Sequence, residues 1–235
     1  MKRSKRMRAI LEKVDPTKEY SLREAIKILK EVACAKFDET VEVAFHMGLD
    51  PRRSDQMVRG SVVLPHGTGK TKRVLVLTKS AVDEAKEAGA DYVGSDEYIE
   101  KIQKGWLEFD AVVATPEVMK DVAKLGRILG PRGLMPSPKT GTVTNRPADV
   151  IRELKKGRVD FKLSRTGDIH VPVGKISFTE DALYENILEL VQALLDAKPA
   201  GAKGAYIQSM HISSTMGPGL KINLRELFNE LQARR

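Results

Sequence analysis

One glycine-rich segment has the composition of a phosphate-binding loop. Residues 66–71 read His-Gly-Thr-Gly-Lys-Thr, and such a loop uses glycines, backbone amides and a lysine to bind nucleotide phosphates. The motif needs another glycine five positions before Gly69, but Leu64 stands there. The surrounding pattern is a strand followed by another strand, so no helix begins at Lys70 to supply amides to a phosphate. We therefore interpret this segment as a mobile linker between domains.

Residue types that serve catalysis and metal binding are present without the spacing that either requires. The histidines are far apart, and none has a Ser, Asp or Cys beside it in a nucleophile motif. We favour structural roles for them, with an RNA-facing role for His170 and His211 as the alternative. The carboxylate pairs at 83–84 and 96–97 begin helices, where the helix dipole accounts for them. No catalytic residue, metal or cofactor is predicted. The four histidines are His46, His66, His170 and His211.

Two short segments combine residue types that suit contact with RNA. Residues 36–40, Lys-Phe-Asp-Glu-Thr, place an aromatic ring between a helix end and a strand start, where the ring either joins the core or packs on a ribose or base. Residues 213–219, Ser-Ser-Thr-Met-Gly-Pro-Gly, form either an ordinary turn or a loop whose hydroxyls face RNA sugars. Ser and Thr donate and accept hydrogen bonds as the 2′-hydroxyl does, so the second segment favours RNA over DNA.

The charge balance indicates a polyanionic partner. The chain has a net charge of +8 and a pI near 9.5, and phosphates release counterions when Lys and Arg bind them. Basic residues without neighbouring acids occur at 1–8, at 52–53 and at 127–139, where Gly and Pro require a shaped loop that presents Arg127, Arg132 and Lys139. The alternatives are a solvated face, a disordered amino terminus, and a loop that caps the edge of a sheet.

The elements that position these segments differ between the flanks and the middle of the chain. Alternation typical of half-buried strands occurs in both flanks, and an antiparallel pair is expected within 159–173, with its turn at 166–168. In the middle, a continuous apolar run at 74–77 indicates a strand covered on both faces, followed by alternating helices and strands. The expected helices are 4–14, 21–33, 81–88, 96–104, 117–125, 148–156, 180–197 and 224–231, and the expected strands are 40–49, 58–64, 74–77, 92–93, 111–114, 159–163, 169–173 and 206–212.

This distribution predicts a protein of the α/β and α+β classes with two domains. Residues 1–67 and 158–235 are expected to form a discontinuous α+β two-layer sandwich domain. Residues 68–157 are expected to form an inserted small Rossmann-like three-layer α/β domain. The chain crosses between the domains near Gly67 and Gly157, and we predict that these glycines act as a hinge.

The sequence contains no recognisable membrane anchor and indicates a reducing compartment. No apolar run approaches the ~20 residues of a spanning helix, and the basic amino terminus is followed by Ile-Leu-Glu-Lys at 10–13 instead of the apolar part of a signal peptide. The single cysteine, Cys34, cannot form an internal disulfide and is expected to pack as a small residue within a helix. We therefore expect a cytoplasmic protein.

Several of these segments together resemble a known family. The chain resembles bacterial large-subunit ribosomal protein one over essentially its whole length, and the matching motifs occur in the family's order and spacing. They are Lys-Phe-Asp-Glu-Thr-Val-Glu at 36–42, Asp-Pro-Arg-Arg at 50–53, Gly-Arg-Ile-Leu-Gly-Pro-Arg-Gly-Leu-Met-Pro at 126–136, Gly-Ala-Lys-Gly at 201–204 and Thr-Met-Gly-Pro at 215–218.

The resemblance implies a non-enzymatic constituent of the large ribosomal subunit. The implied partners are large-subunit rRNA at the mobile stalk, the deacylated exit-site tRNA whose release the family assists, and the mRNA of its own operon. The family represses translation of that operon through an mRNA element similar to the rRNA site. Free of the ribosome, the protein is expected to be a monomer without a cofactor, and in the cell it is expected to be ribosome-associated.

Matched residue by residue, the family's RNA-recognition set falls in the discontinuous domain. Ser164 stands where relatives commonly carry an acid, so no contact is assigned to it. The set implies a preorganised surface that recognises RNA shape and sugar edges instead of a base sequence. It comprises Lys36, Phe37, Thr40, Glu42, Arg165, Thr166, Gly167, Ser209, Thr215, Met216 and Gly217.

Two other classes of function are alternatives at this point. The central α/β domain suits an enzyme that binds nucleotides at the carboxyl ends of its strands, although it lacks a glycine fingerprint. The chain also suits a protein-binding scaffold whose basic surface serves solubility. Calorimetry with nucleotides and the salt dependence of RNA binding distinguish both alternatives from an RNA-binding protein.

Overall fold

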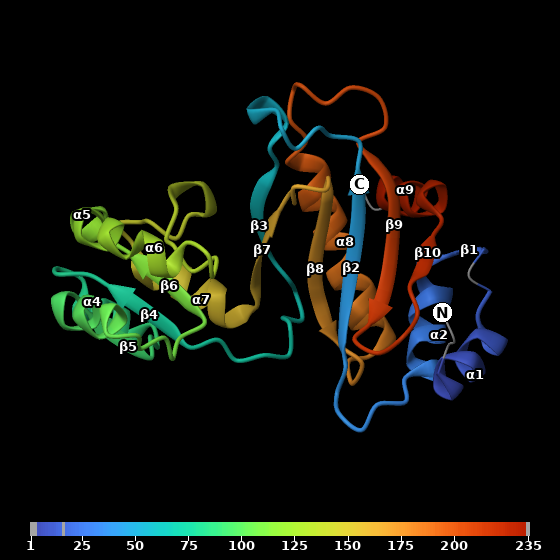
Figure 1. Cartoon of the computed structure of the whole chain (residues 1–235), viewed down its shortest axis with the longest axis horizontal. Coiled ribbons are helices and arrows are strands. Elements are labelled where there is room, and N and C mark those ends of the chain that lie inside the picture. The colour runs from blue at the N-terminus through green and yellow to red at the C-terminus, as the bar shows by residue number, and fades with distance from the viewer. Residues whose placement is uncertain (1–3, 16, 234–235) are drawn as a thin grey trace. The chain divides into compact units, whose positions relative to one another are not determined.

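The computed structural model describes residues 4–15 and 17–233 and shows a mixed α/β chain (Figure 1). The chain divides into two compact units. The flanking unit comprises Met1–Gly69 and Val159–Arg235, and the central unit comprises Lys70–Arg158. Part of the predicted basic amino-terminal cluster, residues 1–3, lies outside the described residues. Among the helices that the structure describes, none has the length and apolar character needed to cross a bilayer.

A five-stranded sheet lies at the centre of the flanking unit. Its spatial order is β1 (Glu19–Tyr20), β10 (Leu220–Ile222), β9 (Ile207–Ser214), β2 (Thr40–Met47) and β8 (Asp168–Lys175). β2 is antiparallel to both β8 and β9, whereas β1 is parallel to β10. Alternation of apolar and polar residues along β2 buries one face of the strand. The buried residues of that face are Val41, Val43, Phe45 and Met47.

Helices cover the apolar face of this sheet. α2 (Leu22–Val32) follows Ser21, whose hydroxyl accepts a hydrogen bond from Glu24 N at 3.3 Å, and α8 (Glu180–Asp196) has the same kind of cap at Thr179. α2 packs against β9 and β10, and α8 packs against β8. The apolar stripes of both helices join the strands in one core. The other α-helices described in this unit are α1 (Lys5–Lys13) and α9 (Leu224–Ala233).

The antiparallel pair predicted within residues 159–173 is wrong. β7 (Arg158–Lys162) pairs with β3 (Arg59–Val63) in a separate two-stranded sheet, whereas β8 pairs with β2. Gly60 permits the pairing of β3 with β7, because a Cβ at that position would lie 2.6 Å from the ring of Phe161. Only glycine lets that ring lie over the partner strand. The turn that follows β7 therefore connects two sheets.

Two other local predictions differ from the structure. α2 ends at Val32, because Ala33 has an extended backbone (φ −61°, ψ 121°), so Cys34 lies beyond the helix and is exposed. The helix expected at 117–125 is interrupted by tighter 3-10 turns, which keep buried side chains at spacings of three and four on one side. The segments are η2 (Pro116–Val118), α5 (Met119–Val122), η3 (Ala123–Leu125) and α6 (Gly126–Leu129).

A three-stranded parallel sheet forms the core of the central unit. Its spatial order is β5 (Tyr92–Gly94), β4 (Val74–Leu77) and β6 (Ala111–Ala114). All four residues of β4 are buried, and they point alternately into two separate apolar clusters. Both faces of the sheet are therefore covered, as its continuous apolar run predicts. The other helices are α3 (Val82–Glu87), α4 (Asp96–Gln103), α7 (Pro147–Lys156) and η4 (Pro138–Thr140); η1 (Ser54–Gln56) lies in the flanking unit.

Candidate nucleic-acid interface

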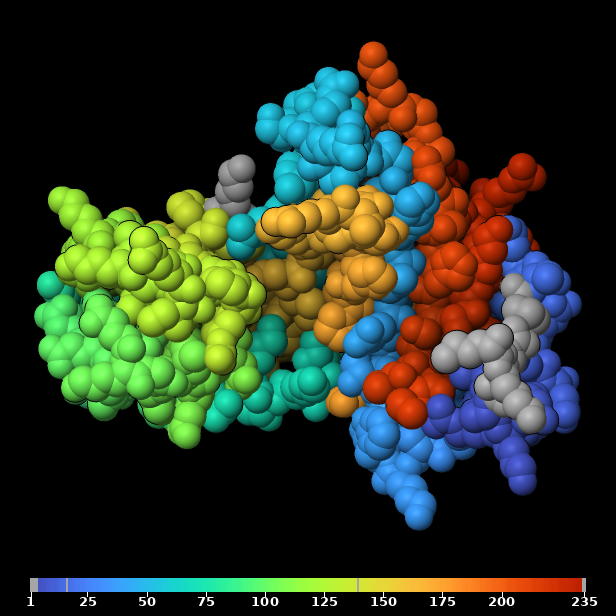
Figure 2. Space-filling view, viewed as in Figure 1, coloured from blue at the N-terminus to red at the C-terminus, as the bar shows by residue number. Residues whose placement is uncertain are grey.

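The face of the five-stranded sheet opposite α2 and α8 is mostly polar, and its residues are half-buried or exposed. Alternation along the strands directs its side chains away from the core. Atoms of β8, β2 and β9 lie next to one another on the surface in Figure 2. We call this surface the open face, and it consists of Thr40, Glu42, Ala44, His46, His170, Pro172, Ser209, His211 and Ser213.

Strand register brings three of the four histidines onto the open face. Ala44 is opposite His170 on β8 and His211 on β9, and His46 lies two residues further along β2. His211 is half-buried, and burial, with a smaller contribution from the charge of Lys221, lowers its pKa below the usual 6.5. Within the described part of the chain, no three His, Cys, Asp or Glu residues are grouped so that they could hold a metal ion.

Two segments border the open face at its Thr40 end. We call them the rim, residues 36–40 and 215–217. Thr215 N donates to Thr40 O at 3.1 Å and Thr40 N donates to Thr215 Oγ1 at 3.0 Å, although 175 positions separate the two residues. Phe37 is 55% exposed and Met216 is 40% exposed, so two large apolar side chains face solvent here. Such side chains suit packing on a ribose or an unstacked base.

Buried Glu39 orders the rim from within. Its carboxylate accepts hydrogen bonds from Ser214 Oγ at 2.7 Å, Met216 N at 2.9 Å and Ala35 N at 3.2 Å. Burial raises the pKa of Glu39, but these hydrogen bonds and the charge of Arg6 together lower it more, so the resulting pKa lies below the usual 4.5. Glu39 is therefore ionised at neutral pH and fixes the backbone at Met216.

Close contacts and hydrogen bonds fix the conformation of the rest of the rim. A Cβ at Gly217 would lie 2.4 Å from Ser214 Oγ, so this position requires glycine for its close approach. Lys175 Nζ donates to Thr40 Oγ1 at 2.9 Å and to Asp38 O at 3.2 Å. These bonds within the protein preorganise the rim, which lowers the cost of ordering it when a ligand binds.

A tight turn borders the other end of the open face. The Ser164 hydroxyl accepts hydrogen bonds from Thr166 N at 3.2 Å and Asp168 N at 3.0 Å, and Gly167 adopts a φ of 87°. Asp168 Oδ1 lies 2.7 Å from His46 Nδ1, and Asp168 Oδ2 accepts from Thr166 Oγ1 at 2.7 Å. These two hydrogen bonds, that of His46 first, lower the pKa of Asp168. Ser164 therefore organises the turn without being one of the predicted contacts.

The structure places the predicted RNA-recognition set on one side of the flanking unit. Sequence reasoning missed three residues that position this set, Glu39, Lys175 and Asp168. Nothing in the sequence distinguishes Glu39 from its exposed neighbour Asp38, because burial there depends on contact with β9. Lys36, Phe37, Thr40, Thr215, Met216 and Gly217 lie at the rim, Glu42 and Ser209 on the open face, and Arg165, Thr166 and Gly167 in the turn.

The other predicted basic clusters have separate positions. Arg53 forms an ion pair with Asp55 at 3.0 Å, so its charge is balanced locally. Arg127 and Arg132 are exposed in the central unit, and the side chain of Lys139 lies outside the described residues. None of these four residues belongs to the open face or the rim.

Both glycines predicted at the crossings adopt a left-handed backbone. Gly157 (φ 112°) ends α7, and Gly67 has a φ of 67°. The fully buried Asn186 of α8 contacts the first crossing directly: its Nδ2 donates to Gly67 O at 2.9 Å and its Oδ1 accepts from His66 N at 3.0 Å. The same Nδ2 donates to Val173 O at 2.8 Å.

Comparisons with known proteins agree on one family. The model of the ribosomal protein L1p/L10e family matches residues 29–218. The chain is 59% identical over 224 residues to the large ribosomal subunit protein uL1 of Protochlamydia amoebophila, covering 95% of each chain. It is 57% identical over 224 residues to the protein of that name from Thermus thermophilus, covering 94% of this chain and 98% of the relative. For Chlamydia pneumoniae the identity is 56% over 228 residues, covering 97% and 98%.

Proposed function

The chain belongs to the ribosomal protein L1p/L10e family, and from this premise we propose that it is a constituent of the large ribosomal subunit that binds rRNA through the open face and the rim. The relatives are named as ribosomal proteins, and the family is structural and not enzymatic. The enzyme alternative is therefore set aside.

The observation that carries this proposal is the exposure of Phe37 and Met216 beside the hydroxyls of Thr40 and Thr215. Folded RNA presents ribose edges, which offer apolar surface and a 2′-hydroxyl that both donates and accepts. The rim offers the matching groups on two segments that backbone and side-chain hydrogen bonds hold together. Phosphates of the same RNA are attracted by the net charge of +8.

Three finer assignments extend this proposal. The rRNA site is the mobile stalk, the deacylated tRNA at the exit site is a second ligand whose release the protein assists, and the mRNA of its own operon is a third. An mRNA element with the shape of the rRNA site competes for the same surface, so translation of the operon falls when free protein exceeds rRNA. The resemblance of motifs such as 36–42 and 215–218 to the family supports these assignments.

We propose that the architecture is a discontinuous two-layer sandwich with an inserted Rossmann-like three-layer domain, joined at a hinge. The division of the chain after Gly69 and after Arg158 supports this arrangement. Gly67 is fixed by Asn186, so the mobile part of the first crossing begins beyond it. Gly157 supplies the second link as the left-handed end of α7.

The first test compares methionines on the same unit. Met216→Asp removes an apolar contact and adds a charge that repels phosphate, so the dissociation constant for a stalk rRNA transcript should rise at least about tenfold. Met57→Asp makes the same chemical change at a side chain that is 47% exposed but outside the rim, and it should leave binding near the wild-type level. Filter binding at fixed salt measures both.

The second test concerns the hydroxyl of Thr215. Thr215→Ala leaves Thr40 N without its partner and removes a group that can face a ribose, so affinity should fall several-fold. Thr215→Ser keeps the hydroxyl and should bind nearly as the wild type does. Thermal unfolding verifies that each variant is folded. If both Met216→Asp and Thr215→Ala bound the stalk transcript with wild-type affinity, the rim would not be part of the RNA-binding site.

A further inference from the structure

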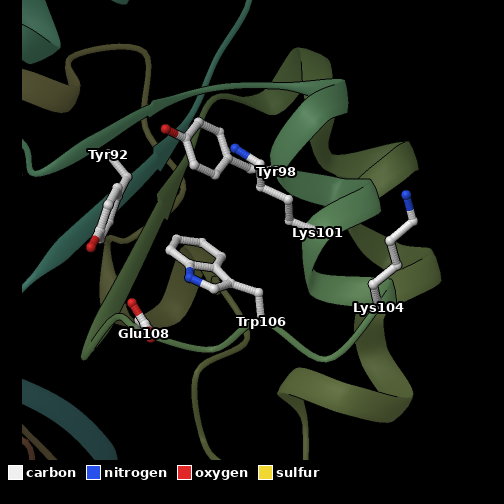
Figure 3. A pocket seen from close by; sticks show the side chains of 6 residues that line it. All are labelled: Tyr92, Tyr98, Lys101, Lys104, Trp106 and Glu108. Carbon is white, nitrogen blue, oxygen red and sulfur yellow. The ribbon is translucent and has the colours of Figure 1, made fainter.

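A concave surface lies in the central unit, and the proposed function does not use it. Its cavity of about 390 Å³ falls in the range of small-ligand sites, which is roughly 300–1,000 Å³. Figure 3 shows three aromatic rings at this cavity, with Lys101 beside Tyr98 and Glu108 beside Trp106, whereas Lys104 extends from the same helix further from the rings. The lining residues are Tyr92, Tyr98, Lys101, Lys104, Trp106 and Glu108, and we call this site the aromatic pocket.

Local backbone structure places the rings of the pocket. Tyr92 belongs to β5, the edge strand of the parallel sheet, and Tyr98 lies in the first turn of α4. α4 ends with Gly105 in a left-handed conformation (φ 98°), with Gly105 N donating to Ile102 O at 2.9 Å and Trp106 N donating to Lys101 O at 3.0 Å. This Schellman pattern reverses the chain and returns the indole towards the two tyrosines.

The rings form a rigid but incompletely buried cluster. The ring centroids of Tyr92 and Trp106 are 4.9 Å apart at 88°, and those of Tyr98 and Trp106 are 5.6 Å apart at 41°. Trp106 also contacts Phe109, which is buried, with the ring centroids 5.5 Å apart. Phe109 serves the core of the central unit, because it is buried. The other three rings keep part of their surface exposed at the cavity.

The charges at the pocket favour an anionic ligand with a planar part. Lys101 Nζ lies 4.7 Å from the centroid of the Tyr98 ring, and Lys104, at the end of the same helix, is exposed. Glu108 is the acidic member of the lining, and its carboxylate can accept a hydrogen bond from an exocyclic amino group of a base. An aromatic side chain of a partner protein would use the rings but would leave the two lysines without a role.

We infer that the aromatic pocket binds an unstacked nucleobase of single-stranded RNA, with the adjoining phosphate at Lys101 and Lys104. Bases stack on aromatic side chains with little dependence on sequence, and lysines beside such a platform neutralise the backbone. The inference does not rest on the open face, because every residue of the pocket lies in the central unit. It gives the chain a second RNA contact that is independent of the rim.

Trp106 is the only tryptophan in the chain, so its fluorescence reports on the aromatic pocket directly. We expect saturable quenching when the full-length protein is titrated with hexa-adenylate, and none with an abasic sugar-phosphate hexamer. Adenosine monophosphate should quench more weakly, because it provides a single phosphate. Equal quenching by the abasic hexamer, or saturable quenching by an acetylated phenylalanine amide at the concentrations where hexa-adenylate acts, would overturn the inference.

Single substitutions separate the contribution of base stacking to RNA binding from the contribution of the lysine charges. Tyr98→Leu should weaken hexa-adenylate quenching about fivefold or more, whereas Tyr98→Phe should retain it. Lys104→Gln should weaken binding and reduce its salt dependence, whereas Lys120→Gln, an exposed lysine elsewhere in the central unit, should change neither. If Tyr98→Leu does not fold, the two lysine variants and the abasic hexamer decide the question. Absence of quenching while stalk transcript still binds would refute the pocket and leave the proposed function intact.

Discussion

The residues that we propose to contact RNA at the rim are positioned by contacts with buried atoms. Glu39 accepts hydrogen bonds from Ser214 and from the backbone of Met216, and Gly217 fits against the Ser214 hydroxyl. The exposed side chains therefore depend on a short chain of interior contacts. A substitution at a residue that does not contact RNA should therefore weaken RNA binding if it breaks these interior contacts.

Gly217→Ala tests that dependence. The added Cβ would lie 2.4 Å from Ser214 Oγ, so Ser214 must move and weaken its bond to Glu39. We expect a loss of about 1–3 kcal/mol in the free energy of unfolding, together with weaker binding of the stalk transcript, because a buried charged acceptor loses a donor. Denaturant titration and filter binding measure the two effects.

Gly219→Ala is the matched control for this experiment. A Cβ at Gly219 would meet no atom within 4 Å, and Gly219 is only two residues away in the same loop. Both its stability and its RNA affinity should stay near those of the wild type. Equal effects of the two substitutions would indicate loop flexibility, and not the contact with Ser214, as the cause.

At the scale of the strands, the open face is a product of register. The strand register places His170 of β8 and His211 of β9 opposite Ala44, on either side of β2. Lys221 of β10 is opposite His211, and Glu19 of β1 forms an ion pair with Lys221 at 2.7 Å. His170 of β8, Lys221 of β10 and Glu19 of β1 therefore lie in one row with His211 across the sheet, and the protonation of His211 should respond to a bound polyanion.

The lowered pKa of His211 predicts two pH effects of opposite sign. Because the folded protein binds this proton less readily than the unfolded chain, stability should fall as the pH drops below the usual 6.5 of histidine. Bound phosphate favours the protonated ring, so RNA affinity should rise over the same interval. Denaturant titration and binding at pH 7.5 and 5.5 measure both. His211→Gln should flatten both profiles, and unchanged profiles would exclude His211 as their source.

The sequence predicts most elements of the fold but not how the strands pair. Alternation in 40–49 and 169–173 identifies β2 and β8, because this pattern depends only on which face of a strand is buried. Proximity along the chain favoured pairing 159–163 with 169–173, and it gave the wrong partner. β1 and β10 have two and three residues, too few for alternation to appear. The row of histidines could not be predicted either, because it depends on which strands pair and in which register.

At the scale of the whole chain, the first crossing between the two units is fastened at one end. Asn186 is fully buried and bonds to the backbone of residues 66 and 67, and a Cβ at Gly69 would lie 2.7 Å from the Lys175 side chain. The linker thus stays attached to the flanking unit as far as Gly69. In the hinge that we propose, the bend at the first crossing therefore lies beyond Gly69.

Asn186→Leu should release this attachment. Three backbone groups, those of His66, Gly67 and Val173, would lose their partner; the bond to Val173 O is fully buried, and a buried group left so costs about 1–3 kcal/mol, whereas water can reach the other two. We expect a loss of at least about 1 kcal/mol in the free energy of unfolding and faster proteolytic cleavage near residue 67. Glu189→Gln, at an exposed position on the same helix, should change neither. Wild-type cleavage kinetics in Asn186→Leu would mean that the crossing is held by other contacts.

The position of β8 has a consequence for self-association. β8 is the last strand of its sheet, and Pro172 lies within it, opposite Glu42. Proline has no amide hydrogen, so the strand offers an interrupted row of donors to any further strand. A second copy of the chain therefore finds a poor template for extending the sheet, and fibril growth from this edge is hindered in the same way. Pro172 therefore has two roles by position: it belongs to the open face, and it interrupts the donors along this edge of the sheet.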